Sequence, residues 1–175
     1  MINSLRRDLP NIPEDVLRQW LLPFAVDIGW PPNAPRWKGI LRETDISYWE
    51  KTEWKLVRIH ASYFIKRSPS FESINGLFEG VFLGAENFHS ESMGKRSKER
   101  CHVQLHQLIN HGKFREPLVL FDFGSGKEVV DGAHRMTAFL GWKFYQKNKS
   151  FVSMLKTKPV CLFEFQYAWV GTSNA

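Results

Sequence analysis

"PLVLFDFGSGKEVVDGAHRMTAFLGW", residues 117–142, is the stretch from which the fold can be read. Its apolar start, residues 117–123, is typical of a buried strand. The glycines within 124–126 predict a tight turn, and residues 127–130 predict the antiparallel partner strand. After Gly132 a helix is predicted, because apolar residues recur there at helical spacing. We therefore expect a hairpin that leads through a glycine into a helix.

Regular structure is also predicted on both sides of this hairpin. Residues 54–65 and 160–170 are rich in β-branched and aromatic residues, which favours strands. A helix is expected from Ser97, which can cap its start, to Gly112, which fits a left-handed residue after its end. The stretch 66–100 mixes glycine, serine, asparagine and charge, so we expect a long, partly mobile excursion there.

The first 50 residues are rich in proline and tryptophan. The sequence PEDVLRQWLLPFA, residues 13–25, predicts one short helix with acidic residues at its positive end. The sequence GWPPNAPRW, residues 29–37, predicts an ordered loop pinned by its two tryptophans. We expect an arm, residues 1–50, packed on an α+β domain, residues 51–175, with a small mixed sheet and flanking helices.

Composition and charge narrow the class of protein. The chain has 175 residues, 43% of them apolar, and a formal net charge of +6, which favours partners that carry phosphate. Cys101 and Cys161 are far apart and form no paired motif, so a reducing cytoplasm is expected. The sequence holds no run of about 20 apolar residues, and we expect no membrane insertion.

The glycine before the predicted helix is the candidate site. A helix start presents unpaired N–H groups, and Gly132 lets a ligand approach the backbone closely. Arg135 can bind phosphate oxygens with two nitrogens, and His134 adds a donor. Asp131 can hold a divalent metal, or cap the helix instead. An ordinary structural turn fits the same residues about as well.

A resemblance to a known superfamily adds to this interpretation. The sequence QLINHGKFRE, residues 107–116, followed by PLVLFDFGSGKEVVDGAHRMTAF, resembles the ParB/sulfiredoxin superfamily and its ParB-like nuclease domain. The resemblance covers residues 100–140 and implies a nucleotide-binding domain. It implies that nucleotide phosphates contact Gly132, His134 and Arg135. It also implies that Arg100 and Gln104, on the preceding helix, line the site.

Two departures from the superfamily pattern limit the activity. Sulfiredoxins carry a reactive cysteine where this chain has Ala133, so their thiol chemistry is excluded. Partition-type ParB proteins continue into a helix-turn-helix region, whereas the residues that follow Leu140 are few and end in a strand-like segment. A ParB-type DNA clamp is therefore not expected.

Two branches of the superfamily remain. The plasmid-borne fertility-inhibition proteins of the Osa type are similar in size, in the opening IPEDVLRQW, residues 12–20, and in the carboxy-terminal core. This resemblance implies a bacterial, cytoplasmic protein that hydrolyses ATP, cleaves DNA and opposes conjugative transfer, with the DNA-transfer machinery as a partner. The other branch, the free-serine kinases, implies phosphate transfer to a small hydroxyl compound. A non-catalytic, nucleotide-dependent binding module is the third hypothesis.

Phosphate chemistry of this kind needs a divalent cation such as Mg²⁺ and a carboxylate. We expect Asp131 to hold the metal, and Asp131, His134 and Arg135 to be catalytic. Glu91 and Glu99 are weaker candidates, for which a solvated surface is the better interpretation.

The run GKRSKER, residues 94–100, gathers cations ahead of the predicted helix. This run predicts a loop that binds DNA through Lys95, Arg96 and Lys98. An ordinary surface loop is about as consistent with the sequence. His102 and His106 are one helical turn apart but lack the glutamate of an H-E-x-x-H zinc motif. We therefore interpret them as a solvated or partner-facing helix side.

Overall fold

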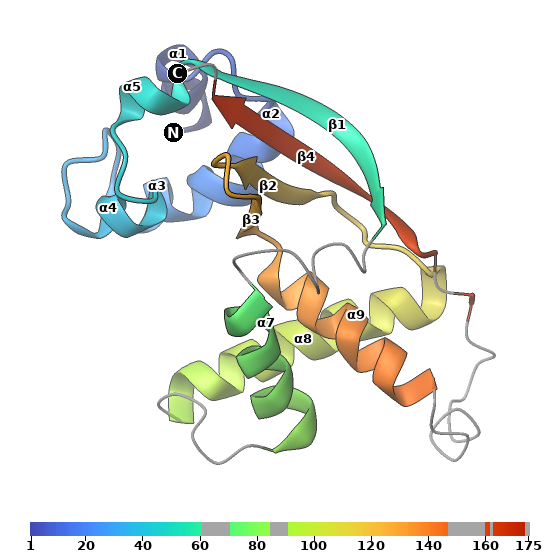
Figure 1. The fold of residues 1–175 in the computed structure, drawn as a ribbon. Helices are drawn as coiled ribbons and strands as arrows, with labels where there is room; N and C mark the ends of the chain where they lie inside the picture. Colours follow the sequence, from blue (N-terminus) through green and yellow to red (C-terminus); the bar gives the residue numbers. More distant parts are fainter. Residues whose placement is uncertain (61–70, 85–90, 147–159, 162, 174–175) are drawn as a thin grey trace. The chain divides into compact units, whose positions relative to one another are not determined.

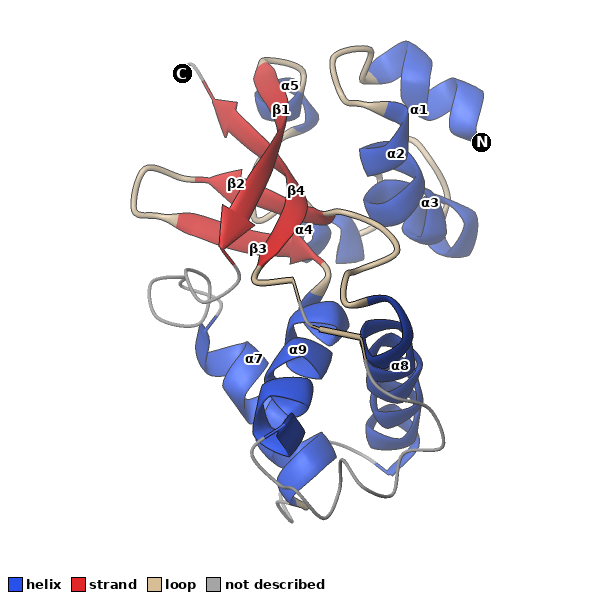
Figure 2. Ribbon diagram, turned by 90° about the vertical axis from the view of Figure 1, so that its right-hand side faces the viewer, coloured by secondary structure: helices blue, strands red, loops and turns tan. Residues whose placement is uncertain are grey.

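The computed structural model describes residues 1–60, 71–84, 91–146, 160–161 and 163–173. Within these residues, helices are combined with a four-stranded sheet in the order β1-β4-β2-β3 (Figure 1, Figure 2). The strands are β1 Thr52–His60, β2 Leu118–Asp122, β3 Lys127–Asp131 and β4 Phe165–Ser173. The chain is therefore a mixed α and β protein with a small sheet, as predicted.

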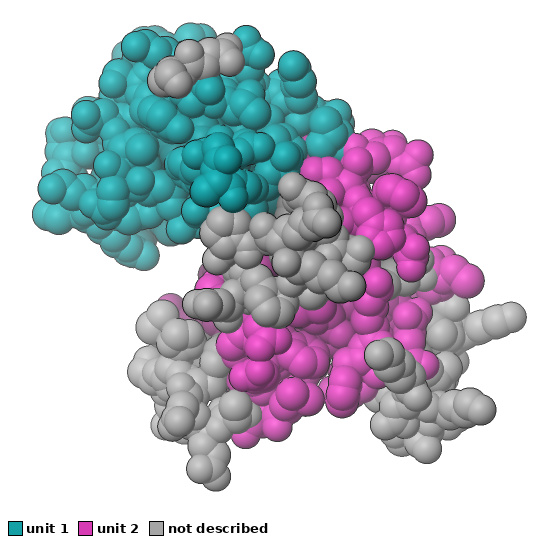
Figure 3. Space-filling model, viewed as in Figure 1, with its two compact units in different colours: residues 1–57, 119–131, 169–175 teal, residues 58–118, 132–168 magenta. Residues whose placement is uncertain are grey.

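Contacts divide the chain into two compact units that alternate along the sequence. Unit 1 comprises residues 1–57, 119–131 and 169–175, and unit 2 comprises residues 58–118 and 132–168. Figure 3 colours the two units separately.

Within the described residues, unit 1 contains six short helical elements. They are α1 Ile2–Asp8, α2 Glu14–Val16, η1 Leu17–Leu21, α3 Leu22–Ile28, α4 Arg36–Ile40 and α5 Ile46–Trp49. The elements α2, η1 and α3 follow one another without a break, so the predicted helix over 13–25 is confirmed and extends to Ile28. Its middle turn, η1, is π-helical.

The proline-rich stretch after α3 is an ordered loop as far as Pro35. The indole Nε1 of Trp30 donates a hydrogen bond of 2.8 Å to the carboxylate of Asp8. The indole Nε1 of Trp37 donates one of 3.1 Å to the carbonyl of Gly29. The two tryptophans therefore pin the loop as predicted, although its last residues belong to α4.

The core of unit 1 is built from tryptophans and strand β2. The rings of Trp20 and Trp49 meet edge to face with centroids 4.7 Å apart, and those of Trp49 and Phe121 lie 4.6 Å apart. Val119 and Phe121 are completely buried in this cluster. The N-terminal helices thus share one core with the strand that the hairpin contributes.

Helices make up most of the described part of unit 2. They are α7 Phe71–Phe78, η2 Glu79–Leu83, α8 Glu91–His111 and α9 Ala133–Gln146. Helix α9 packs against both α7 and α8, and the rings of Phe78 and Phe144 lie 6.0 Å apart.

The long excursion predicted over 66–100 is helical at every described residue except Gly84, and its partial mobility stays a prediction. Residues 71–83 and 91–100 are helical, because Ile74 and Val81 supply buried contacts that tertiary packing stabilises despite the intervening glycine and serine. Residues 66–70 and 85–90 of this stretch lie outside the described residues.

Helix α8 begins earlier than predicted and ends where expected. Because it starts at Glu91, Ser97 lies inside the helix and does not cap it. Gly112 has φ +68°, and its N–H donates to the carbonyl of Leu108 over 2.8 Å. The apolar face of α8 is buried, namely Cys101, Leu105, Leu108 and Ile109.

The predicted hairpin is confirmed. Strands β2 and β3 pair antiparallel, with Asp122 opposite Lys127 at the turn. The carboxylate of Asp122 accepts a hydrogen bond from the backbone N–H of Gly124 and another from the ammonium of Lys127, each 3.0 Å long. These bonds fix the turn, because one side chain joins both of its ends.

The two outer strands differ in their bounds from the prediction, since β1 begins at Thr52 and β4 continues to Ser173. Strand β4 begins at Phe165 and not at residue 160. Strand β1 is confirmed as far as His60. Residue 162 and residues 61–65, on which these predictions also fall, lie outside the described residues.

Candidate functional site

Gly132 forms the turn from which α9 begins. Its φ of +112° is one that residues with a side chain rarely adopt. A Cβ at this position would lie 2.6 Å from Cδ2 of Leu118 and 3.2 Å from Nε of Arg135. The carbonyl of Gly132 accepts the first helical hydrogen bond, from the N–H of Met136 at 3.0 Å. Both the backbone angle and the close packing therefore require glycine here.

Arg135 is a buried arginine whose side chain is hydrogen-bonded to the backbone. Its residue exposure is 6%, and its Nη1 donates to the carbonyls of Glu116, at 3.1 Å, and Pro117, at 2.7 Å. The exposed carboxylate of Glu116 lies 3.9 Å from the same nitrogen. Arg135 therefore ties the first turn of α9 to the segment that leads into β2. One end of its guanidinium is committed to the backbone.

His134 lies close to two arginines. It is half-buried, and its pKa is lowered, first by burial and then by the charges of Arg100 and Arg135. Arg100 is exposed on α8, and α8 packs against α9 within unit 2. The structure thus brings together three of the predicted site residues, which come from two helices. We call Arg100, His134 and Arg135 the cationic cluster.

The remaining predicted site residues stand as follows. Gln104 is half-buried on α8, one helical turn after Arg100. Asp131 ends β3, opposite Val119, and belongs to unit 1. Glu91 begins α8, and Glu99 is exposed on it.

The described residues offer few side-chain ligands for a metal at this site. Among the described residues, no group of three or more His, Cys, Asp or Glu side chains is placed to hold an ion. Mg²⁺ is commonly held by one or two carboxylates together with substrate phosphates and water. Asp131 would supply a single carboxylate to such a site, which is the smallest number in that pattern.

The cations predicted to form a DNA-binding loop lie on a helix. Lys95, Arg96 and Lys98 are exposed in the first half of α8, so the loop prediction is wrong while the exposure is as expected. The pKa of His102 is lowered by partial burial, by Lys98 and by His106. Positive charge therefore continues along α8 from Lys95 to Arg100, and His102 and His106 follow it.

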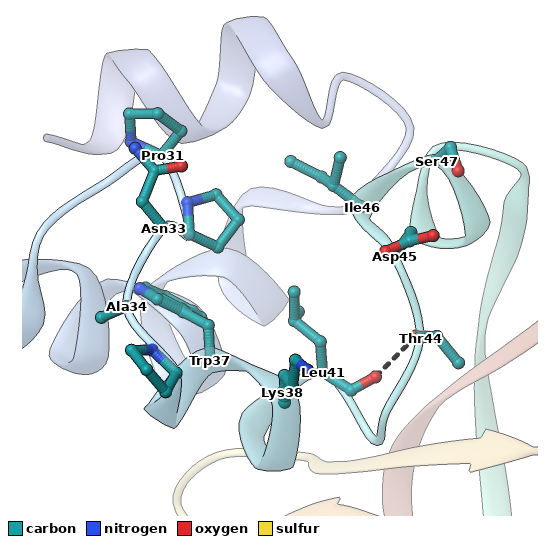
Figure 4. A pocket seen from close by; sticks show the side chains of 12 residues that line it. Pro31, Asn33, Ala34, Trp37, Lys38, Leu41, Thr44, Asp45, Ile46 and Ser47 are labelled. Carbon is teal, nitrogen blue, oxygen red and sulfur yellow. Dashed lines mark hydrogen bonds between the residues drawn. The ribbon is translucent and has the colours of Figure 1, made fainter.

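A pocket in unit 1 was not predicted. It has a volume of about 710 Å³ and lies between the proline loop, residues 31–35, and residues 44–47 (Figure 4). Buried Trp37 and exposed Lys38 are among its lining residues. The prolines indicated a fixed loop, but no local pattern in the sequence showed that residues 44–47 would form the opposite wall.

Comparison of the chain with known protein families, with curated proteins and with solved structures finds no match. The ParB/sulfiredoxin assignment therefore stays a prediction that rests on residues 100–140. Among the described residues, no helix has both the length and the apolar character needed to cross a membrane.

Proposed function

We propose that the chain is a nucleotide-binding phosphohydrolase of the ParB/sulfiredoxin type, and that it binds the phosphates of ATP at the cationic cluster. The supporting observation is that the charges of Arg100, on α8, and of Arg135, in the first turn of α9, both act on His134. Three cationic or potentially cationic groups at a glycine turn form a site for an anion of several charges. A turn with only a structural role does not require Arg100.

The residues of the cluster take different roles in this proposal. Arg100 is exposed and can move toward a phosphate, whereas Arg135 is held by the carbonyls of Glu116 and Pro117. His134 donates a hydrogen bond to a phosphoryl oxygen. Charge that develops on these oxygens during hydrolysis is stabilised by both arginines. Asp131 holding Mg²⁺ stays a prediction, and Asp131→Asn is its test.

The proposal extends to DNA through the first half of α8. Exposed Lys95, Arg96 and Lys98 suit the backbone of a nucleic acid. DNA cleavage, fertility inhibition and contact with a DNA-transfer machinery follow only from the resemblance to Osa-type proteins. These activities are part of the proposal only as implications of that resemblance.

The test measures ATP binding by thermal shift and phosphate release in the presence of Mg²⁺. At 100 times its dissociation constant, bound ATP is expected to stabilise the protein by about 2.7 kcal/mol. Arg100→Ala and His134→Ala should weaken both signals. Lys55→Ala, which removes an exposed cation of β1, should weaken neither. Arg135→Ala is less informative, because it also leaves two carbonyls without their donor.

The outcomes separate the hypotheses. ATP consumption only in the presence of a hydroxyl acceptor indicates the kinase, and binding without turnover indicates the binding module. Absence of a thermal shift with ATP, ADP, GTP and CTP would contradict the proposed nucleotide site.

A further inference from the structure

An exposed row of aromatic side chains follows β4 in unit 2. Phe165 and Tyr167 on β4 are 51% and 55% exposed, whereas Gln166 between them is buried, and Phe163, just before the strand, is 54% exposed. Alternate residues of a strand project on the same side, so Phe165 and Tyr167 lie about 6.6–6.8 Å apart on one side of β4. We call Phe163, Phe165 and Tyr167 the aromatic row. A row of this kind is unusual on a soluble surface, where large apolar side chains normally occur singly.

Cations accompany the aromatic row on the neighbouring strand. The guanidinium of Arg58, on β1, lies 5.4 Å from the ring centroid of Phe165. The imidazole of His60 meets the same ring edge to face at 5.2 Å. These contacts place both side chains beside Phe165.

An acid in the same region, Glu164, forms an ion pair with His60 at 3.1 Å. Its pKa is lowered by His60 and by the charge of Lys143. His60 and Lys143 therefore lie near the carboxylate of Glu164, while Arg58 lies over the ring of Phe165. The face combines exposed rings with an excess of basic groups.

We propose that this face binds single-stranded DNA, with bases stacked on Phe165 and Tyr167 and phosphates near Arg58 and His60. Proteins that bind single strands without reading the sequence combine these two elements, exposed aromatic rings and a basic track. A protein partner would cover the rings equally well but would not explain the cations beside them. The choice of DNA over RNA rests on the proposed function. The proposal that bases stack on this face does not depend on the proposed function.

Binding is measured by fluorescence anisotropy of a labelled oligo-dT of about 12 nucleotides. Phe165→Ala and Tyr167→Ala are each expected to weaken binding by roughly 5-fold or more, because each removes one stacking contact. Phe165→Leu should weaken it similarly, since leucine keeps the apolar bulk but not the ring. Tyr167→Phe should bind as the wild type does.

Charge is tested separately from stacking. Arg58→Ala should weaken binding and reduce its salt dependence, measured between about 50 and 200 mM salt. Glu164→Gln should tighten binding, because it removes the carboxylate of the face. Two matched controls should leave binding within about 2-fold of the wild type. Lys55→Ala removes a cation on the opposite side of β1, and Phe144→Ala removes an exposed ring of α9.

Several results would overturn the proposal. They are unchanged binding by Phe165→Ala and Tyr167→Ala, equal affinity for a duplex, or tighter binding of oligo-U than of oligo-dT. Self-association that Phe165→Ala abolishes, without oligonucleotide binding, would identify a second copy as the occupant. Phe165→Ala should keep the ATP hydrolysis of the wild type, and Arg100→Ala should keep oligo-dT binding. Failure of one proposal is therefore distinguishable from failure of the other.

Discussion

At the scale of single residues, His134 links stability to pH. Its folded pKa lies below the ordinary value of 6.5, because the ring is half-buried and close to Arg100 and Arg135. As the pH falls from 6.5 through the folded pKa, the unfolded chain binds more protons than the folded chain. Folding is therefore favoured above this window and loses that contribution as the pH falls through it.

We predict that the free energy of unfolding decreases as the pH is lowered through this window, and that His134→Gln removes part of this decrease. Urea unfolding at about pH 7.5 and about pH 5.5 measures the difference. Parallel pH profiles of wild type and variant would contradict the lowered pKa. If ATP phosphates bind at the cluster, they raise the pKa of His134, so ATP affinity should increase as the pH falls.

The two cysteines are expected to differ in reactivity. Cys101 is completely buried, and burial raises its pKa to about 12, whereas Cys161 is exposed. The thiolate is the reactive form, so a disulfide reagent near neutral pH should modify the native chain once and the unfolded chain twice. Cys161→Ser should abolish the native reaction. Rapid modification of two thiols in the native protein would show that α8 is not packed as described.

At the scale of elements, two helical glycines give a matched pair. A Cβ at Gly141, on α9, would lie 2.7 Å from two ring atoms of Phe82, while one at Gly76, on α7, would meet nothing within 4 Å. The ring of Phe82 is itself packed against Phe78 and Tyr145. It therefore has little room to move away.

We predict that Gly141→Ala destabilises the protein by about 1–3 kcal/mol through overpacking. Gly76→Ala should stabilise it by about 0.5–1 kcal/mol, because alanine favours the helix. Urea unfolding of both variants measures the contrast. Equal effects of the two substitutions would contradict the packing of η2 on α9.

The accuracy of the sequence predictions also varies by element. The hairpin and α9 were predictable because their signals are local, namely a continuous apolar run in the first strand, glycines at the turn and helical spacing after Gly132. Helix α7 was not, since its stability depends on α9, which lies far away in the sequence. The contact between Arg135 and the carbonyls of Glu116 and Pro117 is likewise non-local. Arg100 was identified as a site residue through a resemblance, whereas His134 was identified from its place just after the glycine turn.

At the scale of the whole molecule, the N-terminal helices complete a core that the hairpin cannot close alone. Val119 and Phe121 of β2 are fully buried in a cluster with Trp20, Trp37 and Trp49. We predict that residues 51–175 expressed alone do not fold cooperatively, because these strand residues lose their apolar partners.

Circular dichroism during thermal unfolding and the dispersion of amide resonances test this prediction. Trp49→Ala in the full chain removes one of these apolar partners. It is expected to lower the free energy of unfolding by about 3–5 kcal/mol. A fragment 51–175 that unfolds in a single sharp transition would support the predicted boundary at residue 50 between arm and domain.

The anchoring of Arg135 has a consequence for molecular recognition. A long side chain normally gives up rotational freedom when it grips a ligand, and that loss weakens the complex. Here the freedom is already lost during folding, since two backbone oxygens hold one nitrogen of the planar group. An anion that reaches this corner meets an arginine that is already oriented. Lysine could not substitute for it, because its ammonium is a point charge on a flexible stem and lacks the planar group that the two carbonyls orient.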